Sequence, residues 1–271
     1  MLSPMQFLRC YTYVGGAVTR LMLRAPFDSN ARNGVRRVAA AAGWRGLRTA
    51  LPRCALDDLI GQRLPVRVDN SIDQEFNVLF YELFVISQLV ASRQPRLIFE
   101  MGTFNGRTTL HLAMNSPAEA RIVTADLPVD TEIFDDPSIV GSCYRDTPYA
   151  EKITQLRQDT RRIDPSPYAG TVEFIFIDAG HEYDDVCNDT DLALRLAKPS
   201  DCLILWHDYS QWPDVQQALD ERYDIGGRYG GLRHIRGTSM AVLDLTRQYA
   251  ENNRRKSRRR AAAGVAGRRD V

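Results

Sequence analysis

The chain has 271 residues, of which 44% are hydrophobic and 25% are charged, proportions that are ordinary for a globular protein. No stretch reaches the roughly 18 uninterrupted apolar residues that a membrane-spanning helix needs. The five cysteines are scattered and lack the Cys-x-x-Cys spacing of a zinc site. They indicate free thiols in a reducing compartment, and we therefore expect a cytoplasmic protein.

The formal net charge of +1 hides an uneven distribution. Residues 1–56 carry nine arginines and one acid, and residues 246–271 carry nine basic residues and two acids, so residues 57–245 must carry −14. An acidic central part argues against specific nucleic-acid binding but suits a divalent cation. The basic ends are expected to be solvated and poorly ordered, the alternatives being contact with anionic lipid, with nucleic acid or with the acidic central part itself.

Three parts follow from these patterns. Residues 1–70 are predicted to form a helical and irregular extension, residues 71–246 an α/β domain, and residues 247–271 a basic disordered tail. The first 25 residues have the spacing of an amphipathic helix that is broken or bent at Gly15-Gly16, and weak association with a membrane surface is one interpretation of it. Further helices are expected at residues 35–42 and 76–90.

The most informative stretch is residues 96–110. A buried strand at Leu97–Phe99 is followed by Glu100, then by Gly102 and Gly106, and then by a helical pattern that ends near Pro117. Such a strand, glycine turn and helix bring backbone N–H groups close to a ligand. The turn differs from the dinucleotide-binding fingerprint because an acid, and not a glycine, directly follows the strand.

Four more strands are expected downstream, and several end in polar residues. The predicted strands cover residues 121–126, 152–156, 172–178 and 202–209, with a loop over residues 127–150 that covers the site and a helix through Leu196. Because the carboxyl ends of parallel strands meet at one edge of a sheet, polar groups from two adjacent strands should gather there. These groups are Asp178, His181, His207 and Asp208.

The motif Glu100-x-Gly102-x-x-x-Gly106 resembles motif I of class I S-adenosylmethionine (SAM)-dependent methyltransferases, with Phe104 in place of the middle glycine. Asp178-x-x-His181 and His207-Asp208-Tyr209 resemble the branch that methylates hydroxyls of sugars and other small molecules. The resemblance covers residues 72–245 and implies a Rossmann-like, doubly wound, mostly parallel seven-stranded sheet, whose last strand would lie at residues 236–243. The SAM-binding residues that it implies are Glu100, Gly102, Thr103, Gly106, Asp126 at the ribose and Asp159 near the adenine.

The same resemblance implies a catalytic centre for O-methylation. A histidine near neutral pKa can remove the proton of an alcohol, and His181 is our choice for this base, supported by Asp178 and His207. Asp178, Asp208 and His207 are the predicted ligands of Mg²⁺ or another divalent cation. His207 departs from the second carboxylate that metal-dependent members often carry, so orienting Asp208, favouring another metal or acting as the base remain open roles for it.

The expected partner is a hydroxylated small molecule such as a sugar, a glycolipid or a polyketide-type acceptor. The rival interpretations are a non-catalytic SAM-binding or interaction protein and a nucleic-acid methyltransferase that uses the basic tail. The pattern does not specify the oligomeric state. His111 and His234 are interpreted as structural, while three aromatic residues either line the acceptor pocket or pack in the core: Tyr183, Trp206 and Tyr209.

Overall fold

The computed structural model describes residues 15–20, 22–24, 49–69, 77–128 and 137–250. Residues 49–210 and the chain from residue 214 form one compact unit, and residues up to 48 form another together with residues 211–213. Residues 15–20 and 22–24 are helical, so Gly15 and Gly16 themselves lie in a helix. The predicted helix at residues 35–42 and the tail from residue 251 lie outside the described residues.

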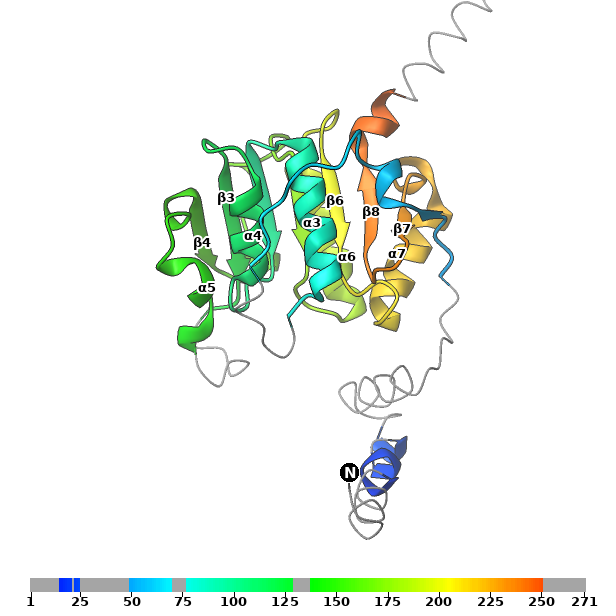
Figure 1. The fold of residues 1–271 in the computed structure, drawn as a ribbon. Coiled ribbons are helices and arrows are strands. Elements are labelled where there is room, and N and C mark those ends of the chain that lie inside the picture. Colours follow the sequence, from blue (N-terminus) through cyan, green and yellow to red (C-terminus); the bar gives the residue numbers. More distant parts are fainter. Residues whose placement is uncertain (1–14, 21, 25–48, 70–76, 129–136, 251–271) are drawn as a thin grey trace, which may run out of the picture. The chain divides into compact units, whose positions relative to one another are not determined.

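The larger unit is built on a sheet of eight strands in the order β1-β7-β8-β6-β5-β2-β3-β4 (Figure 1). All neighbouring strands run parallel except that β8 is antiparallel to both β6 and β7. The strands are β1 (Arg53–Cys54), β2 (Leu97–Met101), β3 (Arg121–Asp126), β4 (Ile153–Arg157), β5 (Phe174–Ile177), β6 (Leu203–Trp206), β7 (Arg233–Ile235) and β8 (Ala241–Asp244). The mostly parallel sheet was predicted, and the additional strand is the two-residue β1, which is too short to show periodicity.

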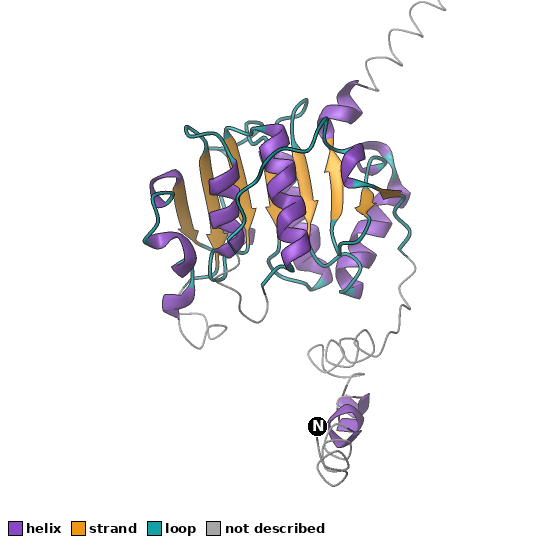
Figure 2. Cartoon of the chain, in the orientation of Figure 1, coloured by secondary structure: helices purple, strands orange, loops and turns teal. Residues whose placement is uncertain are grey.

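Helices cover both faces of this sheet (Figure 2). Helices α3 and α4 lie side by side on one face, and α6 lies on the other (Figure 1). The labelled α-helices of this unit are α3 (Phe80–Arg93), α4 (Arg107–Asn115), α5 (Ser142–Arg145), α6 (Tyr183–Leu196) and α7 (Pro213–Ile225), and residues 245–250 are helical as well. Short 3₁₀ turns occur at Leu56–Asp58, Pro137–Ile139, Ala150–Lys152, Thr160–Arg162 and Gly227–Tyr229.

Two predicted elements differ clearly from the structure. The strand expected over residues 236–243 begins only at Ala241, because the chain turns between β7 and β8 with Gly237 at a φ of +81°. The stretch expected to be a loop over residues 127–150 contains α5 and a 3₁₀ turn in its described part. In both places polar residues form a local hydrogen-bonded turn, and hydrophobic periodicity does not detect such turns.

The core explains why the central strands have almost continuous apolar sequences. β2, β5 and β6 are buried along their whole length, since helices cover both faces of the sheet. From α3, Leu83, Ile86 and Leu89 are completely buried at helical spacing. The connections of β2 and β5 lead away from each other, β2 toward β3 and β5 toward β6, so a crevice is expected between their carboxyl ends.

Candidate active site

The glycine turn after β2 has three residues in the left-handed region of the backbone map. Gly102 has a φ of +94°, Phe104 one of +47°, and Gly106, which caps α4, one of +79°. Phe104 therefore keeps the conformation typical of the glycine that it replaces, at the energetic expense that a side chain meets there. The turn retains the backbone geometry of a ligand-binding glycine loop.

The carboxylate of Asp126, at the end of β3, holds this turn in place. Its Oδ2 accepts hydrogen bonds from the backbone N–H groups of Thr103 at 3.0 Å and Phe104 at 2.7 Å. Its Oδ1 accepts one from Leu127 at 2.8 Å. Because two carboxylate oxygens offer about four acceptor positions, Asp126 retains capacity for a ligand hydroxyl.

A cleft of about 390 Å³ opens at the switch point between β2 and β5. Four of the residues predicted to bind the cofactor or to act in catalysis line it: Gly102, Asp126, Asp159 and Asp178. Residues that we did not predict also line it, among them Phe104, Gln158, Arg161, Asp185 and Asp189. Phe104 belongs to the glycine turn, whereas the other four follow β4 or lie on α6 and are brought to this cleft only by the tertiary fold.

The other three predicted cofactor residues do not line the cleft. Glu100 is completely buried beneath the turn, where its Oε2 accepts hydrogen bonds from the hydroxyls of Thr109 and, at 2.6 Å, Thr124. Burial raises the pKa of Glu100 to about 8, although these two hydrogen bonds act in the opposite direction. Thr103 and Gly106 lie within the turn and shape its backbone.

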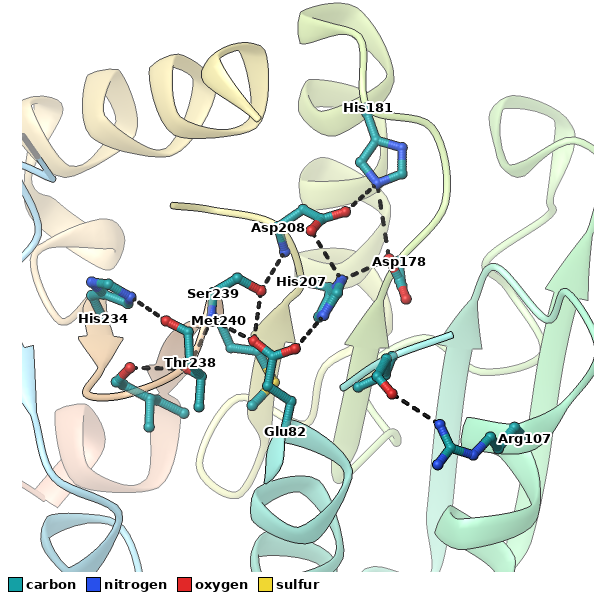
Figure 3. A network of polar contacts seen from close by, with 12 residues as sticks. Glu82, Arg107, Asp178, His181, His207, Asp208, His234, Thr238, Ser239 and Met240 are labelled. Atoms are coloured by element: carbon teal, nitrogen blue, oxygen red, sulfur yellow. Dashed lines mark hydrogen bonds and ion pairs between the residues drawn. The ribbon is translucent and has the colours of Figure 1, made fainter. Parts of the chain in front are cut away.

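The four predicted chemical side chains meet in one cluster beyond β5 and β6 (Figure 3). Nε2 of His181 lies 2.8 Å from Oδ2 of Asp208 and 3.9 Å from Oδ1 of Asp178. Nδ1 of His207 lies 3.2 Å from Oδ1 of Asp178 and 3.4 Å from Oδ1 of Asp208. Asp178 belongs to both the cluster and the cleft, so the two are contiguous.

The electrostatics of the cluster are dominated by opposite charges. Burial alone lowers the pKa of His181, but the hydrogen bond and charge of Asp208, together with the charge of Asp178, raise it overall. His207 is more deeply buried, yet its carboxylate neighbours hold its pKa well above the usual value. Burial acts to raise the pKa of Asp208, and the two histidines outweigh it, so the net shift is downward. The carboxylates therefore favour the charged form of both histidines, and the histidines favour the ionised form of Asp208.

The set Asp178, His207 and Asp208 fits a divalent cation. One ligand atom from each residue lies within 4.8 Å of the others. Donors bound to one ion at about 2.1 Å lie roughly 3.0–3.4 Å apart, which agrees with the two distances from Nδ1 of His207. That nitrogen is buried, and neither carboxylate contact has the geometry of a hydrogen bond.

Glu82, on the first turn of α3, was not predicted as a site residue. Its Oε2 lies 3.0 Å from Nε2 of His207, and its Oε1 accepts hydrogen bonds from the backbone N–H and, at 2.8 Å, the hydroxyl of Ser239. The signal in the sequence was that Glu82 is the one charged residue between positions 77 and 92. A buried carboxylate in an apolar helix needs partners, and His207 and Ser239 are these partners.

The remaining histidines and aromatic residues have structural partners. His111 accepts a hydrogen bond from the backbone N–H of Asp69 at 2.8 Å, and Nε2 of His234 lies 2.7 Å from the carbonyl oxygen of Thr238. Trp206 and Tyr209 are almost fully buried and use their polar atoms within the core. The hydroxyl of Tyr183 donates to Glu221.

Comparison with known proteins agrees with this architecture. Residues 99–209 match the family model described as a methyltransferase domain. The O-methyltransferase TomG from Streptomyces achromogenes, involved in tomaymycin synthesis and solved in complex with SAM, is 18% identical, with a TM-score of 0.50, over 63% of this chain and 82% of that one. An O-methyltransferase from Bacillus cereus in complex with S-adenosylhomocysteine (SAH) is 16% identical, with a TM-score of 0.48, over 63% and 84%. A comparison with curated proteins finds no match.

The matched domain begins in β2 and ends at Tyr209, so it contains every site residue predicted from the sequence. The likeness to TomG shows the shared fold. The fold and the matched domain resemble those of class I SAM-dependent methyltransferases. Within the described residues, no helix is both long and apolar enough to cross a membrane.

Proposed function

We propose that this methyltransferase transfers the methyl group of SAM to a hydroxyl oxygen of a small molecule, a sugar, glycolipid or polyketide-type acceptor. The observation that carries the proposal is that Asp178 belongs both to the cleft at the switch point and to the cluster with His181, His207 and Asp208. The methyl group of SAM in the cleft and the acceptor hydroxyl at the cluster would then lie next to each other. TomG, which shares the fold, is named an O-methyltransferase, in keeping with oxygen as the acceptor atom.

SAM would occupy the cleft in the following way. Asp126 would accept hydrogen bonds from the ribose hydroxyls, and Asp159 would lie near the adenine ring. Gly102, Thr103 and Gly106 would let the backbone approach the cofactor closely. Glu100 would act from beneath the turn, through Thr109 and Thr124.

The acceptor hydroxyl must lose its proton as the new O–CH₃ bond forms. His181 would take this proton, and the Asp208 carboxylate, 2.8 Å from Nε2, would stabilise the resulting imidazolium. Holding the oxygen in line with the sulfonium methyl is the other main contribution of the protein. A divalent cation held by Asp178, His207 and Asp208 would supply Lewis acidity that lowers the pKa of a bound hydroxyl.

The cysteines and the basic ends of the chain bear on its localisation and partners. Cys54, Cys143, Cys187 and Cys202 are free thiols, in keeping with a cytoplasmic location. The basic ends would add weak affinity for anionic surfaces without a specific nucleic-acid target.

Calorimetry with SAH followed by an acceptor screen with methyl-labelled SAM tests the proposal. We expect SAH binding, and label transfer to a hydroxyl of a sugar, glycolipid or polyketide-type acceptor. Absence of SAH binding would overturn the cofactor assignment and favour an interaction protein. Transfer to nitrogen or to nucleic acid alone would overturn O-methylation. Activity that is unchanged in excess EDTA would remove the metal ion from the proposal.

A further inference from the structure

Glu82 connects three segments that are far apart in the sequence. It extends from the first turn of α3 to His207, which follows β6, and to Ser239, which precedes β8 (Figure 3). Ser239 in turn accepts a hydrogen bond through its hydroxyl from the backbone N–H of Asp208 at 3.3 Å. The Glu82 side chain is only 2% exposed. Such a buried carboxylate is held by the donors around it and constrains them in return.

The contacts of Glu82 determine which way the His207 ring faces. Oε1 is occupied by the two donors of Ser239, so Oε2 is the atom that accepts from Nε2–H of His207. With Nε2 facing Glu82, Nδ1 faces Asp178 and Asp208. A carboxylate that accepts the other ring N–H is the usual device for orienting a metal-binding histidine.

We propose that Glu82 is a positioning residue: it holds His207 with its Nε2–H directed at Glu82, so that Nδ1 is presented to a divalent cation together with Asp178 and Asp208. This inference rests on the metal site of the proposed function. It accounts for a histidine at a position where a second carboxylate would also fit. The imidazole nitrogen makes the site better suited to Co²⁺ or Zn²⁺ than an all-oxygen set would be.

The variant Glu82→Gln separates this role from simple bracing of α3. The amide has nearly the same volume, but its oxygen must face the backbone N–H of Ser239, because two donors cannot face each other. Its NH₂ group then donates to Nε2 of His207, which places the ring proton on Nδ1 and directs it at the metal site. The variant therefore largely keeps the contacts that brace α3, but it loses the His207 tautomer whose Nδ1 can bind a metal ion.

Asp244→Asn is the matched control. Asp244 is a buried carboxylate at the end of β8 that pairs with Arg93, in the last turn of α3. It therefore also ties α3 to the sheet, without contacting the cluster. Co²⁺ and SAH affinities of metal-free protein are measured by calorimetry for the wild type and both variants.

We expect Glu82→Gln to weaken Co²⁺ binding about 10- to 100-fold, with SAH affinity unchanged, and Asp244→Asn to leave both affinities unchanged. Co²⁺ affinity equal to that of the wild type in Glu82→Gln would overturn the positioning role. Should that variant not fold, Glu82→Asp keeps the charge but shortens the side chain by one methylene, and unaltered Co²⁺ binding there would likewise overturn the role. A wild type that binds SAH but no Co²⁺ would refute the metal site, and one that binds neither would refute the proposed function.

Discussion

A Cβ atom on Gly102 would lie 1.9 Å from the backbone oxygen of Asp178. The turn after β2 and the end of β5 thus approach each other as closely as only glycine permits. The contact explains why this glycine is needed even before a cofactor binds. The contact joins the glycine turn after β2 to Asp178, the residue that belongs both to the cleft and to the cluster with His181, His207 and Asp208.

Gly102→Ala is therefore expected to lower the free energy of unfolding by about 3 kcal/mol or more, from overlap and backbone strain together. SAH binding should be lost as well. Gly170→Ala is the control, since Gly170 has a similar positive φ of +68° with nothing within 4 Å of its Cβ position. That variant should lose only about 1 kcal/mol. Equal losses in urea denaturation would show that strain alone, and not the contact with Asp178, matters.

His181→Ala is expected to reduce turnover by roughly 10²- to 10⁴-fold, the usual contribution of a general base. The affinity for SAH should not change, because His181 does not line the cleft in which we propose that SAM binds. Steady-state kinetics with labelled SAM and calorimetry with SAH check the two statements separately. Turnover close to that of the wild type would assign the base to another residue, with His207 the next candidate.

The pH dependence of the reaction should follow His181. Its pKa is raised overall, chiefly because the Asp208 carboxylate outweighs the effect of burial. A base acts in its unprotonated form, so kcat/KM is expected to rise as the pH passes through this elevated pKa. In EDTA-treated protein, Asp208→Asn should lower the pKa of His181, as followed by NMR titration. An unchanged titration curve would contradict the assigned cause.

Glu100 predicts a different pH effect, on stability. Burial raises its pKa from 4.5 to about 8 in the folded protein. Between these values the folded state holds more protons than the unfolded chain, so the free energy of unfolding should fall as the pH rises, by an amount on the order of 5 kcal/mol across the range. Glu100→Gln cannot ionise and should flatten this decline. Parallel pH–stability curves for the variant and the wild type would refute the assignment of this pH effect to Glu100.

The sequence predicted those parts of the site that depend on strand ends. Asp178, His181, His207 and Asp208 come together because parallel strands share a carboxyl edge, and Asp126 follows from the same rule. Glu100 was harder, since a carboxylate after a strand can face either a ligand or the interior, and here it faces the interior. In the fold, the five longer parallel strands were expected, whereas β7 was not predicted.

The rest depends on contacts between distant segments. Glu82 lies 125 residues from His207 in the chain, and its apolar helical surroundings predicted a core helix and no site residue. Asp185 and Asp189 lie on α6, and only the packing of this helix brings them to the cleft. Contacts between residues so far apart in the chain leave no periodic pattern in the sequence.

The two-residue strand β1 has a consequence for the handling of this protein. His234 and Arg236 donate their backbone N–H groups to the carbonyl oxygens of Pro52 and Cys54, both at 2.9 Å, and so occupy the outer margin of β7. An open sheet margin is a template for pairing with another molecule. A truncated protein that begins after residue 56 should consequently form concentration-dependent aggregates, detectable by light scattering. The protein that retains β1 should not aggregate under the same conditions.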